Sequence, residues 1–96
     1  MDEKTIKLAD GTTIQNCGAG YVDGYLWIYP ALTMKETAGL FLDEEKTAEI
    51  LYIVDGKTIR YKGYTDCILL NAVPGGVRVQ MTGGTEPERI INTEQN

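Results

Sequence analysis

A chain of 96 residues with 43% apolar and 24% charged side chains has the composition of one small globular domain, which argues against a disordered chain or a coiled coil. Its 14 acidic residues outnumber its 9 basic ones, and a formal charge of −5 argues against a duplex-DNA binder that works by neutralising phosphates. The sequence contains neither His nor Ser, which excludes Ser–His and Cys–His nucleophiles, His-ligated zinc and an imidazole general base.

The first predicted element is a hairpin. Thr5–Ala9 and Thr12–Cys17 are rich in β-branched residues, and they flank Asp10-Gly11. Asp-Gly between two alternating runs is the strongest short-range hairpin signal, because both residues tolerate a positive φ. We expect the glycines of residues 18–20 to interrupt the strand structure after this hairpin.

The next predicted strand begins at Tyr21 or Tyr25 and ends at Tyr29. Three amphipathic rings alternate along its second half and therefore share one face: Tyr25, Trp27 and Tyr29. Apolar residues occupy the positions between them. Both faces are thus apolar or amphipathic, which indicates a central strand or a face offered to a partner.

A helix is predicted after this strand. Thr33 and Glu36 form a capping-box pattern, and apolar residues at helical spacing extend the pattern over Met34–Leu42. The helix could run on to Lys46. The acidic run 43–45 is most simply a solvated helix end or loop, since it lacks the spacing of a calcium-binding loop.

The second half of the sequence predicts four more strands. Ala48–Val54 and Lys57–Tyr61 flank a second Asp-Gly turn, and Gly63 is expected to mark a bulge or bend. Tyr64–Asn71 and Val77–Met81 are joined by a Pro-Gly-Gly turn.

The chain is predicted to form a single α+β domain over residues 1–82, followed by a polar C-terminal tail over residues 83–96. Within the tail, Thr85–Glu88 repeats the capping-box pattern, so it could start a short helix or be a frayed terminus.

The order of about three strands, one short helix and four strands predicts a mostly antiparallel sheet of about six or seven strands. One short helix after the third strand covers only part of a sheet face. We expect the remaining aromatic face to close into a barrel, form a sandwich or meet another copy of the chain, and self-association is an economical way to bury it.

No catalytic residue, metal ligand or cofactor site is predicted, and the chain is expected not to be an enzyme. The Gly18-Ala19-Gly20 run does not match a dinucleotide-binding motif, because it precedes a strand and its third glycine is misplaced. Cys17 and Cys67 read as buried free thiols, with a disulfide or a redox pair as the alternative.

One basic and aromatic stretch, Arg60–Tyr64, suggests binding chemistry. Its tyrosines and the aromatic strand could stack bases or a nucleotide while nearby cations neutralise phosphate. The same pattern also fits cross-strand packing or a protein partner. The candidate ligand- or partner-binding residues are Tyr25, Trp27, Tyr29, Arg60, Tyr61, Lys62, Tyr64 and Arg78.

The N-terminus shows no signal peptide, and no apolar run approaches the roughly 20 residues that span a bilayer. We therefore expect a product that is soluble and cytosolic, with no membrane contact.

Several short segments in this order resemble a group of small uncharacterised proteins encoded in phages and prophages of gut Firmicutes. The similarity covers Thr5 to Met81. The segments are Leu8–Thr12, Gly24–Trp27, Thr33-Met34, Glu45–Ala48 and Tyr61–Tyr64. The resemblance implies a phage gene expressed inside a bacterium, and no activity or functional residue comes with it.

Together these observations predict a small acidic binding protein. We expect a stoichiometric inhibitor or sequestering protein that acts against a host defence factor or its nucleotide signal, in the host cytoplasm. The alternative is a virion accessory of the tail or baseplate. The expected partner is a host or phage protein or a small anionic, nucleotide-like ligand, with no duplex DNA; a homo-oligomer is also expected.

Overall fold

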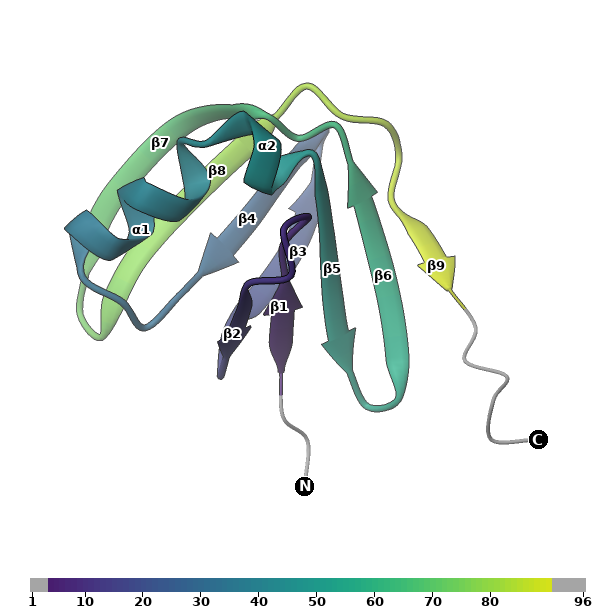
Figure 1. Cartoon of the computed structure of the whole chain (residues 1–96), viewed down its shortest axis with the longest axis horizontal. Helices are drawn as coiled ribbons and strands as arrows, with labels where there is room; N and C mark the ends of the chain where they lie inside the picture. The colour runs from purple at the N-terminus through teal and green to yellow at the C-terminus, as the bar shows by residue number, and fades with distance from the viewer. Residues whose placement is uncertain (1–3, 91–96) are drawn as a thin grey trace.

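The structure is a computed structural model that describes residues 4–90 of the chain (Figure 1). That range contains nine strands and two short helices. In chain order they are β1 (Thr5–Lys7), β2 (Thr13–Gln15), β3 (Gly18–Val22), β4 (Tyr25–Tyr29), α1 (Met34–Phe41), α2 (Glu44–Thr47), β5 (Glu49–Val54), β6 (Lys57–Lys62), β7 (Asp66–Val73), β8 (Gly76–Thr82) and β9 (Glu88–Ile90).

The strands form two antiparallel sheets. Sheet A has the order β2-β1-β5-β6-β9, and sheet B has the order β3-β4-β8-β7. The prediction of a β-rich, mostly antiparallel fold is confirmed. The expectation of one sheet of six or seven strands is wrong, and so is the barrel, because the strands divide between two sheets.

A third Asp-Gly turn explains why four strands, instead of the predicted three, precede the helices. Asp23 and Gly24 have φ values of 53° and 85°, and they join β3 to β4 as a hairpin. The predicted break at residues 18–20 is therefore wrong, since these residues begin β3. The helical region follows the fourth strand rather than the third.

The helical region is divided at Asp43. The predicted capping box is confirmed: the Thr33 hydroxyl accepts from the Glu36 amide at 3.1 Å, and the Glu36 carboxylate accepts from the Thr33 amide at 3.0 Å. Asp43 is extended, with φ −98° and ψ 109°, and its carboxylate caps α2. A continuous helix to Lys46 is thus wrong, because the acidic run begins a second helix.

The segment after β8 returns to the body of the fold. Of the two alternatives given for this segment, the short helix is wrong: β9 pairs with β6, with Thr58 opposite Ile90. The Tyr64 hydroxyl also donates to the Thr85 carbonyl at 2.6 Å. Residues 83–90 of the predicted tail therefore lie against sheet A, and residues 91–96 lie outside the described residues.

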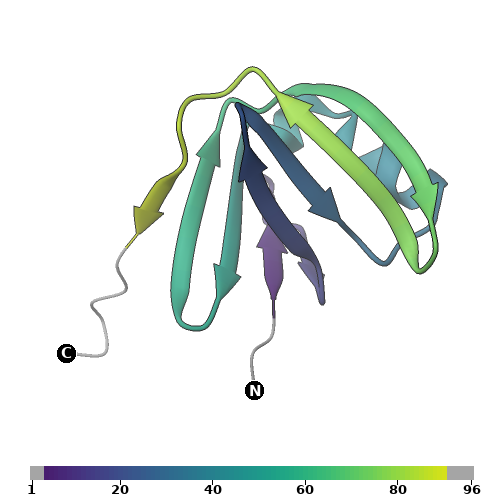
Figure 2. The ribbon, with the colours of Figure 1, turned by 180° about the vertical axis from the view of Figure 1, so that it is seen from behind.

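One apolar core lies between the inner faces of the two sheets. Alternation along β8 turns Val77, Val79 and Met81 inward, and Arg78 and Gln80 outward. Helix α1 packs on the inner side, over β7 and β8. The outer face of sheet B, seen from the side of Figure 2, has neither helix in front of it. The buried apolar side chains are Ile6, Leu8, Ile14, Cys17, Leu26, Ile28, Phe41, Ile50, Tyr52, Tyr61, Tyr64, Val77, Val79 and Met81.

Removing the capping box should weaken the whole domain. We expect Thr33→Ala to lower the free energy of unfolding by about 1 kcal/mol, because the Glu36 amide loses its acceptor. The control is Thr85→Ala, since the Thr85 contact with Tyr64 uses the backbone carbonyl. Urea denaturation followed by circular dichroism measures both, and equal stability of Thr33→Ala and the wild type would contradict the role of the cap.

Candidate functional site

The three rings predicted to share a face do so on the outer side of β4. Tyr25 and Tyr29 are 36% and 47% exposed, and Trp27 is half-buried between them. Arg78 of β8 lies beside them, with its guanidinium carbon 5.8 Å from the centre of the Trp27 ring. That distance is within cation–π range. We call this set of four residues the aromatic face.

The residues in the same cross-strand row as Trp27 are uncharged. In the cross-strand row through Trp27, the paired residues are Gly20, Gln80 and Leu69. A Cβ at Gly20 would meet nothing within 4 Å, so open space lies beside the tryptophan. The ring is therefore flanked by a glycine on one side and an amide on the other.

Positive charge is concentrated at one point of this face. Arg78 pairs with Asn71 across β7, and an acidic residue, Asp66, comes only at the far end, opposite Thr82. The Arg78 Nε is buried and has no hydrogen-bond acceptor among residues 4–90. Buried donors in folded proteins are nearly always paired, so the unpaired Nε of Arg78 is unusual. The guanidinium of Arg78 is instead in contact with the Trp27 ring.

Tyr61 and Tyr64 lie in the core, away from the aromatic face. They are 2% and 0% exposed, and their rings pack edge to face with centres 5.9 Å apart. Burial raises the pKa of Tyr61, and it raises the pKa of Tyr64 to about 12, with a smaller contribution from Tyr21. Neither ring face is available for stacking on a base.

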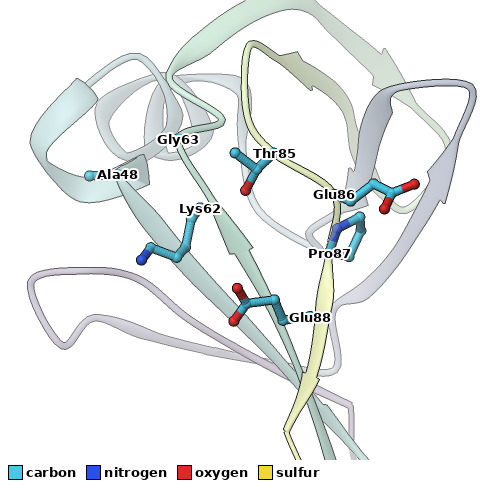
Figure 3. Close-up of a pocket in the computed structure, with 7 residues that line it drawn as sticks. All are labelled: Ala48, Lys62, Gly63, Thr85, Glu86, Pro87 and Glu88. Carbon is cyan, nitrogen blue, oxygen red and sulfur yellow. The ribbon is translucent and has the colours of Figure 1, made fainter.

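Arg60 and Lys62 lie on sheet A, also away from the aromatic face. Arg60 donates to the Glu88 carboxylate at 2.6 and 3.1 Å, and Glu49 lies at 3.6 Å. Lys62 lines a pocket of about 690 Å³ together with two carboxylates, Glu86 and Glu88 (Figure 3). Acidic side chains outnumber basic ones around this pocket, so phosphate is not favoured there.

The eight predicted residues thus separate into three places. The structure brings four of them together on the aromatic face, two in the core and two on sheet A. Gly20, Gln80 and Asn71 were missed as neighbours of the aromatic face. The Asp23-Gly24 turn was the signal for Gly20, because it predicts a strand on each side. No local pattern pairs β4 with β8.

The chemistry of the thiols argues against nucleophilic catalysis by cysteine. Burial raises the pKa of the Cys17 thiol to about 12, which keeps it protonated at neutral pH. Both cysteines are free, and Cys67 is half-buried.

Two features are absent from the part of the chain that the structure describes. Over residues 4–90, no group of three or more Cys, Asp or Glu side chains is placed to hold a metal ion. No helix in that range has the length and apolar character needed to cross a membrane.

The chain matches no protein-family model, no curated protein and no solved structure. A functional assignment therefore depends on the geometry of its own residues.

The two thiols should differ in reactivity. We expect iodoacetamide at pH 8 to alkylate Cys67 well before Cys17, because Cys17 is fully buried and its thiolate is disfavoured. Mass spectrometry of timed, quenched digests measures both rates. Cys17 reacting as fast as Cys67 would show that the core around it is open.

The Arg60–Glu88 pair should be sensitive to acid. Arg60 lowers the pKa of Glu88 from its ordinary value of 4.5. A lowered pKa in the folded state stabilises the fold above pH 4.5, and this contribution is lost as the pH falls through the lowered pKa.

Carboxyl-carbon NMR titration measures the pKa of Glu88 directly. We expect Arg60→Gln to return that pKa towards 4.5, whereas the control Lys46→Gln leaves it unchanged. An unshifted Glu88 in the wild type would show that β9 is not held by this pair.

Proposed function

We propose that this chain is a non-enzymatic binding protein that recognises a partner protein through the aromatic face. The observation that carries the proposal is that tryptophan, two tyrosines and an arginine are gathered on an outer sheet face. Neither helix covers that face (Figure 2). Tyr, Trp and Arg are the residues enriched where binding energy is concentrated in protein interfaces.

The rings suit burial against a protein. A tyrosine or tryptophan removes a large apolar area from water while its hydroxyl or N–H keeps a polar partner, so it is tolerated on a surface before binding. Tyr25 and Tyr29 project most of the exposed area, and Trp27 lies between them with open space above Gly20. A partner side chain can therefore contact the tryptophan.

The charge of this face predicts the chemistry of the partner. Arg78 is a cation in a chain of formal charge −5, and it has an unfilled donor. Because Arg78 is only half-buried, a carboxylate or backbone carbonyl of the partner would bind the part of its guanidinium that remains exposed, and an arginine–carboxylate bond is among the stronger hydrogen bonds. In a symmetric contact between two copies that is centred on Arg78, the two guanidiniums would oppose each other, whereas a different protein can place an acceptor there.

A nucleotide fits this face less well than a protein. Phosphate recognition needs several cations close together, but Arg60 and Lys62 lie on the other sheet, and Arg60 is occupied by Glu88. The aromatic face keeps only Arg78 for a phosphate.

The resemblance to phage-encoded proteins supplies a setting for this proposal. In that setting the partner is a host protein, and the chain is its stoichiometric inhibitor in the bacterial cytoplasm. A role in the virion tail or baseplate is the alternative outcome of the experiment below.

The test first identifies the partner and then measures how much residues of the aromatic face contribute to its binding. The tagged chain is expressed in a Firmicute host, the complex is isolated, and native mass spectrometry gives its stoichiometry. Calorimetry with the purified partner then compares variants. We expect a one-to-one complex in which Trp27→Ala or Arg78→Gln raises Kd by about 30-fold or more, the size of effect seen for central interface residues.

Matched controls are provided by surfaces away from the aromatic face. Lys62→Gln and Tyr21→Ala should leave Kd within about threefold of the wild type; Tyr21 is 37% exposed, like Tyr25, but it faces inward from β3. The proposal is overturned if the controls abolish binding while the face variants do not. It is also overturned if the chain is found only in phage particles or binds only itself.

A further inference from the structure

A second surface, independent of the aromatic face, lies where the two sheets open beside β3. An open pocket of about 350 Å³ lies there between the inward side of β3 and the inner face of sheet A. Its lining includes Tyr21 from β3, Tyr52 from β5 and Tyr61 from β6. Pro87 and Arg89 line it on the side of β9.

The strand register explains why a charge reaches this pocket. Tyr52 is paired with Ile59, and Ile59 is paired with Arg89, so the three residues form one cross-strand row. That row is on the core side of sheet A, because Tyr52 is 92% buried. Arg89 therefore lies on the inner face of sheet A, on its edge strand β9.

Among residues 4–90, Arg89 is the only charged side chain that lines the pocket. It takes part in no ion pair with a described carboxylate, whereas Arg60, one strand away on the opposite face, has two. An anion entering the pocket would thus meet the Arg89 guanidinium, while the Glu86 carboxylate, which contributes to the raised pKa of Tyr64, lies outside the lining.

The other walls present aromatic and apolar surface. Tyr21 packs edge to face on Tyr64 with ring centres 6.4 Å apart, and Tyr61 packs on Tyr64 in the same manner. These contacts hold both lining rings against a fully buried tyrosine, so the walls are formed before any ligand binds. Gly20, next to Tyr21 in β3, contributes only backbone to the pocket, because its Cβ position is on the outer face of the strand.

We infer that this pocket binds a small planar aromatic anion, with its ring against the exposed part of Tyr21 and its carboxylate or phosphate on Arg89. A guanidinium matches both anions through paired N–H donors, and aromatic rings pack on tyrosines edge to face or offset. The volume is at the lower end of ligand pockets, which indicates one or two fused rings.

Arg89 also admits a purely structural role. An inward-pointing charge on an edge strand discourages edge-to-edge pairing between molecules. The two roles differ in what the loss of the charge changes: ligand affinity in one case, and aggregation in the other.

The test is an amide NMR titration of the full chain with indole-3-carboxylate, and in a separate arm with phenyl phosphate. We expect saturable shifts at Gly20, Tyr21 and Arg89. Arg89→Gln should weaken binding of the better probe about tenfold or more, because a charged hydrogen bond is lost. The uncharged indole-3-carboxamide should bind weakly and equally to both forms.

The control is Arg78→Gln, which removes the cation of the aromatic face and should leave these affinities unchanged. This separates the pocket from the proposed protein interface, since either can fail while the other holds. Arg89 is exposed at the edge of the sheet, so its variant should keep the wild-type melting temperature.

Three results would overturn the assignment. The first is the absence of saturable shifts at millimolar probe in the wild type. The second is a set of shifts centred on Trp27 and Arg78 instead of the pocket. The third is an unchanged affinity in Arg89→Gln together with increased light scattering, which would assign Arg89 to protection of the sheet edge.

Discussion

The strict alternation of β4 and β8 is the constraint on which the rest of the structure depends. Leu26 and Ile28 turn inward from β4 and meet Met81 and Val79 of β8, so the residues between them must turn outward. Between residues 4 and 90 there is only one helix as long as eight residues, α1, and it lies on the inner side. Trp27 and its neighbours are consequently left facing solvent, where a partner can bury them.

Local signals in the sequence predicted local structure well. Two Asp-Gly turns, the Thr33 capping box and the shared face of the rings on β4 were readable, because each depends on residues close in the chain. The pairing of β4 with β8 and of β6 with β9 was not readable, because these contacts join strands about thirty to fifty residues apart. Tyr61 and Tyr64 illustrate the limit, since nothing local distinguishes a buried tyrosine from a binding one.

The two proposed surfaces lie on opposite sides of one strand. Along β3, Gly20 is paired with Trp27 and faces outward, whereas the next residue, Tyr21, faces the pocket between the sheets. A protein on the outer face and a small anion in the pocket would therefore be separated by the thickness of a single strand. Apart from Gly20, whose backbone lines the pocket, each ligand would bind on residues that the other does not touch.

The glycines of β3 lower the stability of this strand and keep the Trp27 ring accessible. Glycine in a strand costs about 0.5–1 kcal/mol relative to alanine through backbone entropy. At Gly18 and Gly20 a methyl group would meet nothing within 4 Å, and neither backbone has a positive φ. Alanine would thus make β3 more stable while covering part of the surface beside Trp27. Glycine in β3 therefore lowers the stability of the strand, and in return the Trp27 ring stays accessible to a partner.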